Sequence, residues 1–419
     1  MSLQAGVAQR EITPPIGTAL IGYIARTGPA TGVHDPLYAR ALLLADDDAA
    51  ALLITCDLLG LTLAFVQRVR AAIAAAIGIP ANHVLICCSH THAGPATLFL
   101  QDCGTIDEAY LGWLQQELVG LAAAAKANEQ PARFGVGQGQ VTTGYHNRRT
   151  PGDVVDPALG VLSVADGAGK LLAIVLNFAC HPTCLGADNQ LISAEYCGVA
   201  TATLAAATGA TVLFITGAIG DVGPIARGWA MMNELGQAIA EEALRVLHTI
   251  AHQSWAGVAV RQAELRLPLL PLPTVEQVRA AVDQFETTQA TADAKTLPLH
   301  PKIPAAMRAW GAATIAALQS GRAANDVTSE VQLIQLRGLT LVSAPGELFV
   351  ELGLAIKAVL SPQPSFIGGF GNDNVGYLPA RRAYVHGGYE IMEAYKYYGY
   401  PAALAPEAGE LLVEAVKNW

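Results

Sequence analysis

Histidines follow apolar segments at two places in the chain, and together they could hold one catalytic metal ion. His90 and His92 lie two residues apart after the apolar stretch 83–89, and His181 follows a second apolar run. If the backbone at His90 and His92 is extended, both rings project from one face and can share a site. A lone histidine there would more often be a hydrogen-bonded core residue. Three converging neutral imidazoles suit zinc, which keeps one position open for water in catalytic sites.

Such a site also needs an anion and usually a proton shuttle. Glu347 and Tyr377, each beside glycine at a predicted strand end, are candidates. Glu347 could instead occupy the first turn of the following helix, where the helix dipole favours carboxylates. Tyr377 could instead be a packing aromatic.

Two polar loops add further candidates. Arg148 and Arg149 form a basic pair in an acidic protein and could orient a carboxylate or carbonyl oxygen, although loop arginines are usually just solvated. The glycine-rich segment 217–224 implies a tight turn or a close approach to a ligand. Neither a Gly-x-Ser-x-Gly elbow nor a His-Glu-x-x-His helix occurs in the sequence.

The seven cysteines are an odd number scattered through apolar segments, which predicts reduced, buried thiols and a cytoplasmic protein. The N-terminus has no secretory signal pattern, in agreement with that location. Cys180 and Cys184 lack a second cysteine pair that would complete a thiolate zinc site. A thiol enzyme using Cys88 or Cys180 beside histidine is a weaker alternative.

Strand-like and helix-like segments alternate along the whole chain, which predicts an α/β fold of mixed β-sheets flanked by helices. Between the strands, residues 268–324 change character and predict an inserted helical hairpin. The expected strands are 37–44, 50–58, 83–89, 134–141, 159–164, 171–179, 211–216, 258–267, 327–337, 339–344 and 366–370. The expected helices are 63–77, 107–125, 194–207, 229–247, 275–288, 305–318, 347–360 and 406–416.

Composition excludes several classes of protein. The chain has 419 residues and a formal net charge of −10, which opposes binding to nucleic-acid phosphates. With 52% hydrophobic and 14% charged residues it does not resemble a disordered chain. The apolar runs break before the roughly 18 residues that a membrane span needs, and there is no basic amphipathic helix for lipid docking.

Taken in order, these segments resemble the neutral/alkaline ceramidase family, specifically its N-terminal zinc amidase domain. The resemblance spans most of the chain and implies a single catalytic domain over residues 1–419. It is carried by seven collinear motifs: Gly22–Tyr23, Ser89–Pro95, Asn147–Arg148, Asn177–Thr183, Gly220–Val222, Pro345–Glu347 and Gly371–Glu390.

The resemblance implies a role for each site residue. The zinc ligands would be His90, His181, Glu347 and Tyr377. His92 would move protons at the scissile bond. The substrate's polar atoms would be bound by Arg148 and Tyr389.

Two departures from the family pattern change the expected substrate. The family's glycine-rich loop places a serine in the active site, whereas this chain has Gly223 at that substrate-binding position. The chain also ends about 40 residues after Tyr377, so we expect no C-terminal β-sandwich domain. Both departures favour a small or soluble substrate over ceramide.

The sequence therefore predicts a zinc-dependent hydrolase of an amide (N-acyl) bond in a small molecule. Because a metal polarises either carbonyl, a zinc esterase or lactonase is the nearest alternative. A catalytically inactive ligand-binding relative is a third reading, which Gly223 encourages. The hairpin at 268–324 could serve as a lid or as a subunit contact in a homo-oligomer.

Overall fold

The computed structural model describes residues 3–47, 49–150, 152–255, 257–291 and 300–419. Asp48, which lies between the expected strands 37–44 and 50–58, and residues 292–299 of the expected insertion lie outside this part of the chain. Within the described residues, no helix combines the length and apolar character needed to cross a membrane.

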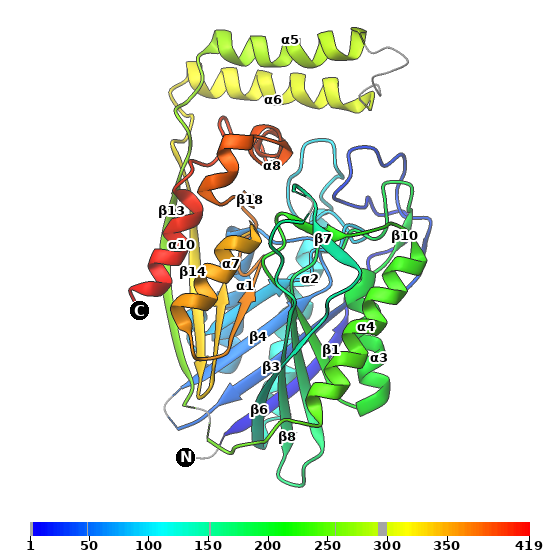
Figure 1. Cartoon of the computed structure of the whole chain (residues 1–419), viewed down its shortest axis with the longest axis vertical. Helices are drawn as coiled ribbons and strands as arrows, with labels where there is room; N and C mark the ends of the chain where they lie inside the picture. The colour runs from blue at the N-terminus through cyan, green and yellow to red at the C-terminus, as the bar shows by residue number, and fades with distance from the viewer. Residues whose placement is uncertain (1–2, 48, 151, 256, 292–299) are drawn as a thin grey trace.

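An eight-stranded mixed sheet forms the centre of the molecule (Figure 1). Its inner pairs are mostly antiparallel, and the outer pairs β4 with β5 and β9 with β11 are parallel. Strands 38–45 and 158–166 are nearly continuous apolar runs, as expected where both faces of a sheet are covered. In sheet order the strands are β11 (Thr211–Thr216), β9 (Leu171–Phe178), β8 (Ala158–Asp166), β6 (Gln130–Gln140), β1 (Gln4–Glu11), β3 (Tyr38–Ala45), β4 (Ala50–Cys56) and β5 (Val84–Cys88).

Four helices cover one face of this sheet and bury their apolar sides against it. The Asp107 side chain caps one of them by accepting from the amides of Ala109 and Tyr110. The helices are α1 (Leu63–Ile77), α2 (Glu108–Ala127), α3 (Glu195–Thr208) and α4 (Trp229–Leu247).

A second, four-stranded sheet packs on the other face and shares an apolar core with the first. On its outer side lie the helices α7 (Val350–Leu360) and α10 (Ala408–Lys417). Its strands, in order, are β13 (Ala259–Pro268), β14 (Asp326–Leu336), β15 (Leu339–Ser343) and β17 (Ser365–Gly368). The predicted α/β class with mixed sheets and flanking helices is thereby confirmed.

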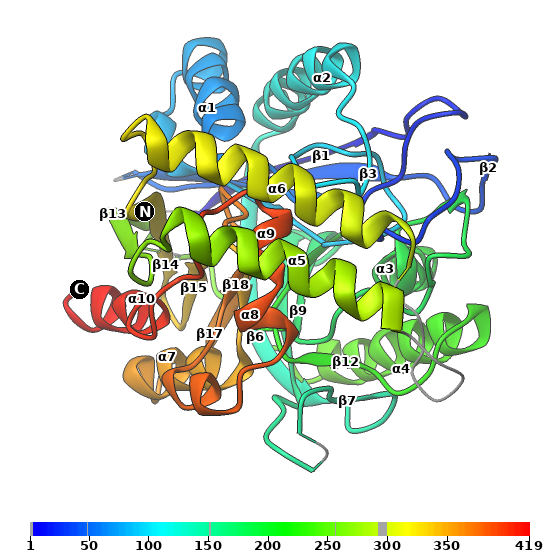
Figure 2. The same ribbon diagram turned by 90° about the horizontal axis from the view of Figure 1, so that it is seen from above.

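The helical hairpin lies between β13 and β14, where the sequence predicts it. It consists of α5 (Val275–Thr291) and α6 (Lys302–Gln319), which pack side by side. Figures 1 and 2 show both helices lying across the top of the molecule, over the short helices α8 (Tyr389–Met392) and α9 (Ala394–Tyr397).

Several short elements complete the fold. They are the strand pairs β2 (Gly32–Val33) with β10 (Leu191–Ile192), β7 (Tyr145–Asn147) with β12 (Val222–Pro224), and β16 (Glu347–Leu348) with β18 (Tyr377–Leu378), and the 3-10 turns η1 (Ala81–His83) and η2 (Arg381–His386).

The helix expected from Glu347 starts later, at Val350. The backbone amide of Glu347 donates to the carbonyl of Gly376 (2.9 Å), so this residue belongs to a strand ladder. The Asp221 carboxylate accepts from the amide of Val350 (2.8 Å) and fixes the new helix start. Glu347 is therefore not a first-turn helix residue.

Candidate active site

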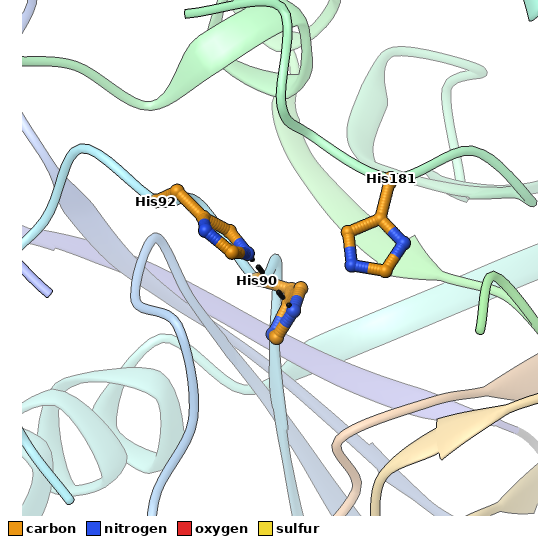
Figure 3. Close-up of side chains that lie close together, drawn as sticks. All are labelled: His90, His92 and His181. Atoms are coloured by element: carbon orange, nitrogen blue, oxygen red, sulfur yellow. Dashed lines mark hydrogen bonds between the residues drawn. The ribbon is translucent and has the colours of Figure 1, made fainter. Parts of the chain in front are cut away.

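Three histidines converge above the ends of the central strands (Figure 3). One ring nitrogen from each of His90, His92 and His181 lies within 4.8 Å of the others. The Nε2 atoms of His90 and His92 are 3.2 Å apart. This grouping is the one that the sequence pattern predicts.

The local geometry that produces the grouping is not the expected one. Strand β5 ends at Cys88, and His90 has a left-handed backbone with φ of 69°. The two rings therefore meet through a tight bend rather than through alternation along an extended strand. Such a conformation is costly for a residue with a side chain and persists only where the surroundings enforce it.

Hydrogen bonds orient two of the rings. The Nδ1 atom of His90 donates to the carbonyl of Leu59 (2.8 Å), and that of His181 donates to the carbonyl of Ile219 (2.9 Å). Both Nε2 atoms are thus left unprotonated and able to accept, and Nε2 of His92 already lies within hydrogen-bond distance of that of His90. Burial lowers the pKa of His90 to about 3 and the pKa of His181 well below its usual range, so both rings are neutral at pH 7.

Glu347 supplies the carboxylate of the site. Its Oε2 atom lies 3.1 Å from Nε2 of His181 and 3.7 Å from Nε2 of His90. The Oε1 atom accepts from the hydroxyl of Tyr398 (2.9 Å). Tyr377 lies beside Glu347 because strands β16 and β18 pair these two residues directly.

The polar atoms that the site leaves without partners fit a metal ion. Oε2 of Glu347 is buried and has no hydrogen-bond partner. It faces the unprotonated Nε2 atoms of two neutral imidazoles. Nitrogen and carboxylate ligands in one buried cluster are the donor set of zinc hydrolases. The residues present therefore suit such an ion.

His92 is held from three sides. Its ring lies 4.9 Å from the ring of Tyr23, and its carbonyl accepts from the buried Arg26 guanidinium (2.8 Å). Gly22 approaches so closely that a Cβ atom there would lie 2.3 Å from Nδ1 of His92. That Nδ1 atom is buried without a hydrogen-bond partner. The Gly22–Tyr23 motif thus contributes to this site by shaping the space around His92.

The side chains of Phe370 and Tyr398 also contact the cluster, and neither residue is among the sequence candidates. The ring of Phe370 stacks on that of His90 at 3.9 Å with an interplanar angle of 9°. Tyr398, as above, donates to Glu347. Phe370 precedes the motif at 371–373, and Tyr398 belongs to an aromatic-rich run, but neither pattern specifies a contact with a residue so distant in sequence.

The two arginines are paired rather than freely solvated. Arg148 donates to the carbonyl of Gly220 (2.8 Å) and to the Tyr377 hydroxyl (2.9 Å). Glu390 lies 3.3 Å from Arg148 and forms an ion pair with Arg149. This arrangement fixes the segment that carries Tyr389, whose side chain is 51% exposed at the rim of the site.

Gly223 lies in β12 opposite His146 of β7, so the glycine-rich segment leads into a strand pair. A Cβ atom at this position would make an ordinary contact, 3.7 Å from Cδ of Arg148. The site therefore has room for the family's serine, and steric exclusion does not explain the glycine.

A cavity of about 420 Å³ opens beside the cluster. A second, more polar cavity of about 390 Å³ includes Arg148 and Arg149, and Tyr389 lines both cavities. The first cavity is lined by Gly22, Tyr23, Ile24, Ala25, Leu59, His90, His92, Leu100, Cys103, Phe285, Ile303, Glu347, Tyr377, Tyr389, Glu393, Tyr397 and Tyr398. It therefore combines three of the candidate metal ligands, His90, Glu347 and Tyr377, with an apolar wall.

The cysteines offer little as nucleophiles. All seven are free and buried. Burial raises the pKa of Cys88 and of Cys180 well above the usual range, so both remain thiols at pH 7. This opposes the thiol-enzyme reading.

Fold and site together define an α/β protein with a buried histidine and carboxylate cluster at strand ends. The profile described as neutral/alkaline non-lysosomal ceramidase, N-terminal, matches residues 3–213, which is half of the chain. The chain belongs to this family, as the sequence motifs predict.

Relatives and solved structures agree with this assignment. The chain is 25% identical to a neutral ceramidase of Pseudomonas aeruginosa over 217 residues, covering 47% of this chain and 32% of the relative. The match thus spans about a third of that protein. A crystal structure of neutral ceramidase from P. aeruginosa superposes with a TM-score of 0.75 at 18% identity, covering 100% of this chain and 74% of the other. A solved ceramidase complexed with C2 gives 0.76 at 16% identity with the same coverage.

Proposed function

We propose that the protein is a zinc-dependent hydrolase of an amide (N-acyl) bond in a small molecule. The observation that carries this proposal is the unpartnered carboxylate oxygen of Glu347, which faces the unprotonated Nε2 atoms of His90 and His181 at the edge of a cavity. The name of the P. aeruginosa relative, neutral ceramidase, supports amide cleavage over other hydrolytic reactions.

In this proposal His90, His181, Glu347 and Tyr377 would hold the zinc ion. When bound, zinc supplies a Lewis acid that polarises a carbonyl and lowers the pKa of water to about 7. Overall, hydroxide from water adds to the acyl carbon, the C–N bond breaks, and the amine leaves with a proton.

Side chains of the protein would transfer the proton and bind the polar atoms of the substrate. His92 has a lowered pKa because it is buried beside His90 and His181, so it is neutral and able to accept a proton. It would then return that proton to the departing nitrogen. Arg148 and Tyr389 would bind the substrate's polar atoms, and Gly223 would lie against the same substrate. Arg148 also holds the hydroxyl of Tyr377 in place.

The size of the cavity supports a small substrate. Its volume of about 420 Å³ lies at the low end of the range for pockets that enclose a drug-sized ligand. We further propose that residues 1–419 act as one catalytic domain. The seven unpaired cysteines support a location in the reducing cytoplasm.

Metal content provides the first test. We expect about one zinc per chain by plasma mass spectrometry of protein purified without added metal, and loss of that zinc in His90→Ala and in His181→Ala. His34→Ala is the matched control, because His34 pairs with Asp35 on the surface, away from the cluster. A parent chain that holds no zinc, even after zinc is added, would rule out the proposed mechanism.

A substrate panel then identifies the scissile bond. Amides, acetylated amines, esters and lactones are offered to the zinc-loaded protein. Faster turnover of amides than of matched esters would support the proposal. Preference for esters or lactones would replace it with a zinc esterase or lactonase, and no turnover of any compound would favour the inactive, ligand-binding reading.

A further inference from the structure

The apolar part of the cavity is completed by the inserted hairpin. Phe285 of α5 and Ile303 of α6 line the same cavity as His90 and Glu347. The candidate metal ligands come from strand ends in the body of the molecule, whereas the hairpin lies above that body (Figure 1). The wall at Phe285 and Ile303 therefore belongs to a different part of the chain from the reacting groups.

The hairpin is fixed in this position by polar contacts at the start and in the middle of α6. Lys302 donates through Nζ to the carbonyl of Arg26 (2.6 Å). Farther along the helix, Nε1 of Trp310 donates to the carbonyl of Tyr400 (2.8 Å). Both acceptors belong to segments that flank the cavity, so these hydrogen bonds fix the position of the hairpin relative to the cavity.

The ring of Phe285 makes a cation–π contact with a buried lysine. The Nζ atom of Lys396 lies 4.7 Å from the centre of the Phe285 ring and 5.6 Å from that of Trp310. Lys396 is 6% exposed, and such desolvated cation–π contacts are among the stronger ones. Ile303 packs against a buried cluster that includes Leu100 and Met307. Both side chains are thus supported by packing and form a firm wall.

The chemistry of the lining selects an apolar group. Ile24, Leu59, Leu100, Phe285 and Ile303 contribute only hydrocarbon surface. The charged side chains of the lining are Glu347, within the candidate metal cluster, and Glu393. A polar or ionic group placed against the hydrocarbon wall would lose its water without gaining partners.

We propose that the hairpin limits the acyl group of the substrate. The cavity takes an apolar acyl chain of short to medium length, and Phe285 and Ile303 are the residues that set the longest chain accepted. This inference rests on the proposed hydrolase function, because it assigns the apolar end of the cavity to the acyl side of the scissile amide. Long acyl chains meet the wall and bind less well.

The test is a chain-length series. The zinc-loaded parent and its variants are assayed for kcat/KM on N-acyl anilides of one amine, from acetyl to palmitoyl. We expect Phe285→Ala and Ile303→Ala each to move the optimum to longer chains and to raise the ratio of long-chain to short-chain kcat/KM at least roughly tenfold. Ile303→Phe, which adds volume at the wall, is expected to move the optimum to shorter chains.

Ile315→Ala is the matched control. Ile315 lies on the same helix and is partly buried like Ile303, but it does not line the cavity. Its substitution is expected to leave the chain-length profile of the parent unchanged. Unchanged profiles in both Phe285→Ala and Ile303→Ala, or the same shift in Ile315→Ala, would overturn the inference.

Binding of saturated carboxylates separates this inference from the proposed function. Calorimetric affinities of the parent and the same variants are measured for carboxylates from acetate to palmitate. If the parent hydrolyses no anilide, the hydrolase function fails, and the carboxylate series still decides the inference. A shift of the tightest-binding length in Phe285→Ala and Ile303→Ala supports a length limit at the wall, whereas equal profiles reject it.

Discussion

At the scale of single residues, two buried polar atoms of the candidate site have no hydrogen-bond partner. Nδ1 of His92 and Oε2 of Glu347 are both buried without hydrogen bonds. Leaving such atoms unpaired costs roughly 1–3 kcal/mol each. Packing alone gives no reason to retain them, whereas an ion or a substrate would satisfy them. Keeping these atoms unpaired therefore lowers the stability of the folded protein, and a bound ion or substrate would restore it.

The proton-transfer role that we propose for His92 leads to a specific expectation. His92→Ala should keep its zinc, because the other proposed ligands remain, while kcat on the preferred amide falls by roughly 100-fold. Steady-state kinetics and metal analysis on the same preparation measure both quantities. Normal turnover would remove His92 from the mechanism, and loss of zinc would instead make it a ligand.

Glu195 makes stability depend on pH. Burial raises its pKa from 4.5 to about 7, although the amide of Leu185 donates to its carboxylate and opposes that shift. As the pH rises above 4.5, the unfolded chain loses this proton before the folded chain does. The carboxyl therefore destabilises the folded state increasingly between about pH 4.5 and 7.

In the Glu195→Gln variant the side chain does not titrate, so this contribution to the pH dependence of stability is absent. We expect the melting temperature of the variant, relative to that of the parent, to increase between pH 5 and pH 8. The corresponding gain in unfolding free energy is on the order of a few kcal/mol. Differential scanning calorimetry at both pH values measures it. An equal difference at the two pH values would show that the pKa of Glu195 is not raised.

At the scale of elements, the sequence specifies the long helices and strands and leaves the short ones open. Helix α1 and strand β11 run between the predicted residues, because periodic apolar positions and stops such as Gly78 are local signals. Strands β16 and β18 have only two residues each and exist through pairing with each other. That pairing, and not propensity, places Glu347 beside Tyr377.

The candidate site likewise has residues that local sequence patterns reveal and contacts that only tertiary packing creates. His90, His92 and His181 could be found because each follows an apolar strand. The stacking of Phe370 on His90 could not, since it brings together residues remote in sequence that both have left-handed backbones. Tertiary packing enforces such conformations, and residue types do not reveal them.

The contact of α9 with the hairpin predicts a local change in stability. Lys396→Met keeps the buried stem and removes the cation, which is worth about 2 kcal/mol at a desolvated site. Amide exchange in α6 should then accelerate roughly 10- to 30-fold, while the central sheet keeps its protection. Hydrogen exchange with mass spectrometry resolves the two regions. Lys417→Met, at an exposed lysine of α10, is the matched control, and equal exchange in both variants would contradict the expectation.

At the scale of the whole molecule, a buried ion pair joins the two sheets. Arg70 of α1 donates to Glu330 (2.6 Å) and to Gln332 (2.7 Å), both in β14, and to the carbonyl of Val84 in β5 (2.7 Å). The side chains of Arg70 and Glu330 are 4% and 5% exposed. Because the guanidinium bridges strands of both sheets, its loss weakens their association.

Removal of the arginine should destabilise the entire protein. Arg70→Met leaves the Glu330 carboxylate buried without its cation, which costs about 3–5 kcal/mol. Urea unfolding should show a lower midpoint for the whole transition. The double variant Arg70→Met/Glu330→Gln removes the stranded charge and should recover a substantial part of the loss. A single variant with the parent's midpoint would show that the pair does not link the sheets.

The hairpin leaves and rejoins the second sheet at facing positions, since Pro268 of β13 pairs with Asp326 of β14. A tight turn between these two residues would keep the register of β13 and β14 and omit α5 and α6. The hairpin is in this sense a removable module. Its sequence can diverge in length and in side chains while the strand ends that carry the histidines stay unchanged, so substrate range and reaction chemistry can evolve on separate segments of one chain.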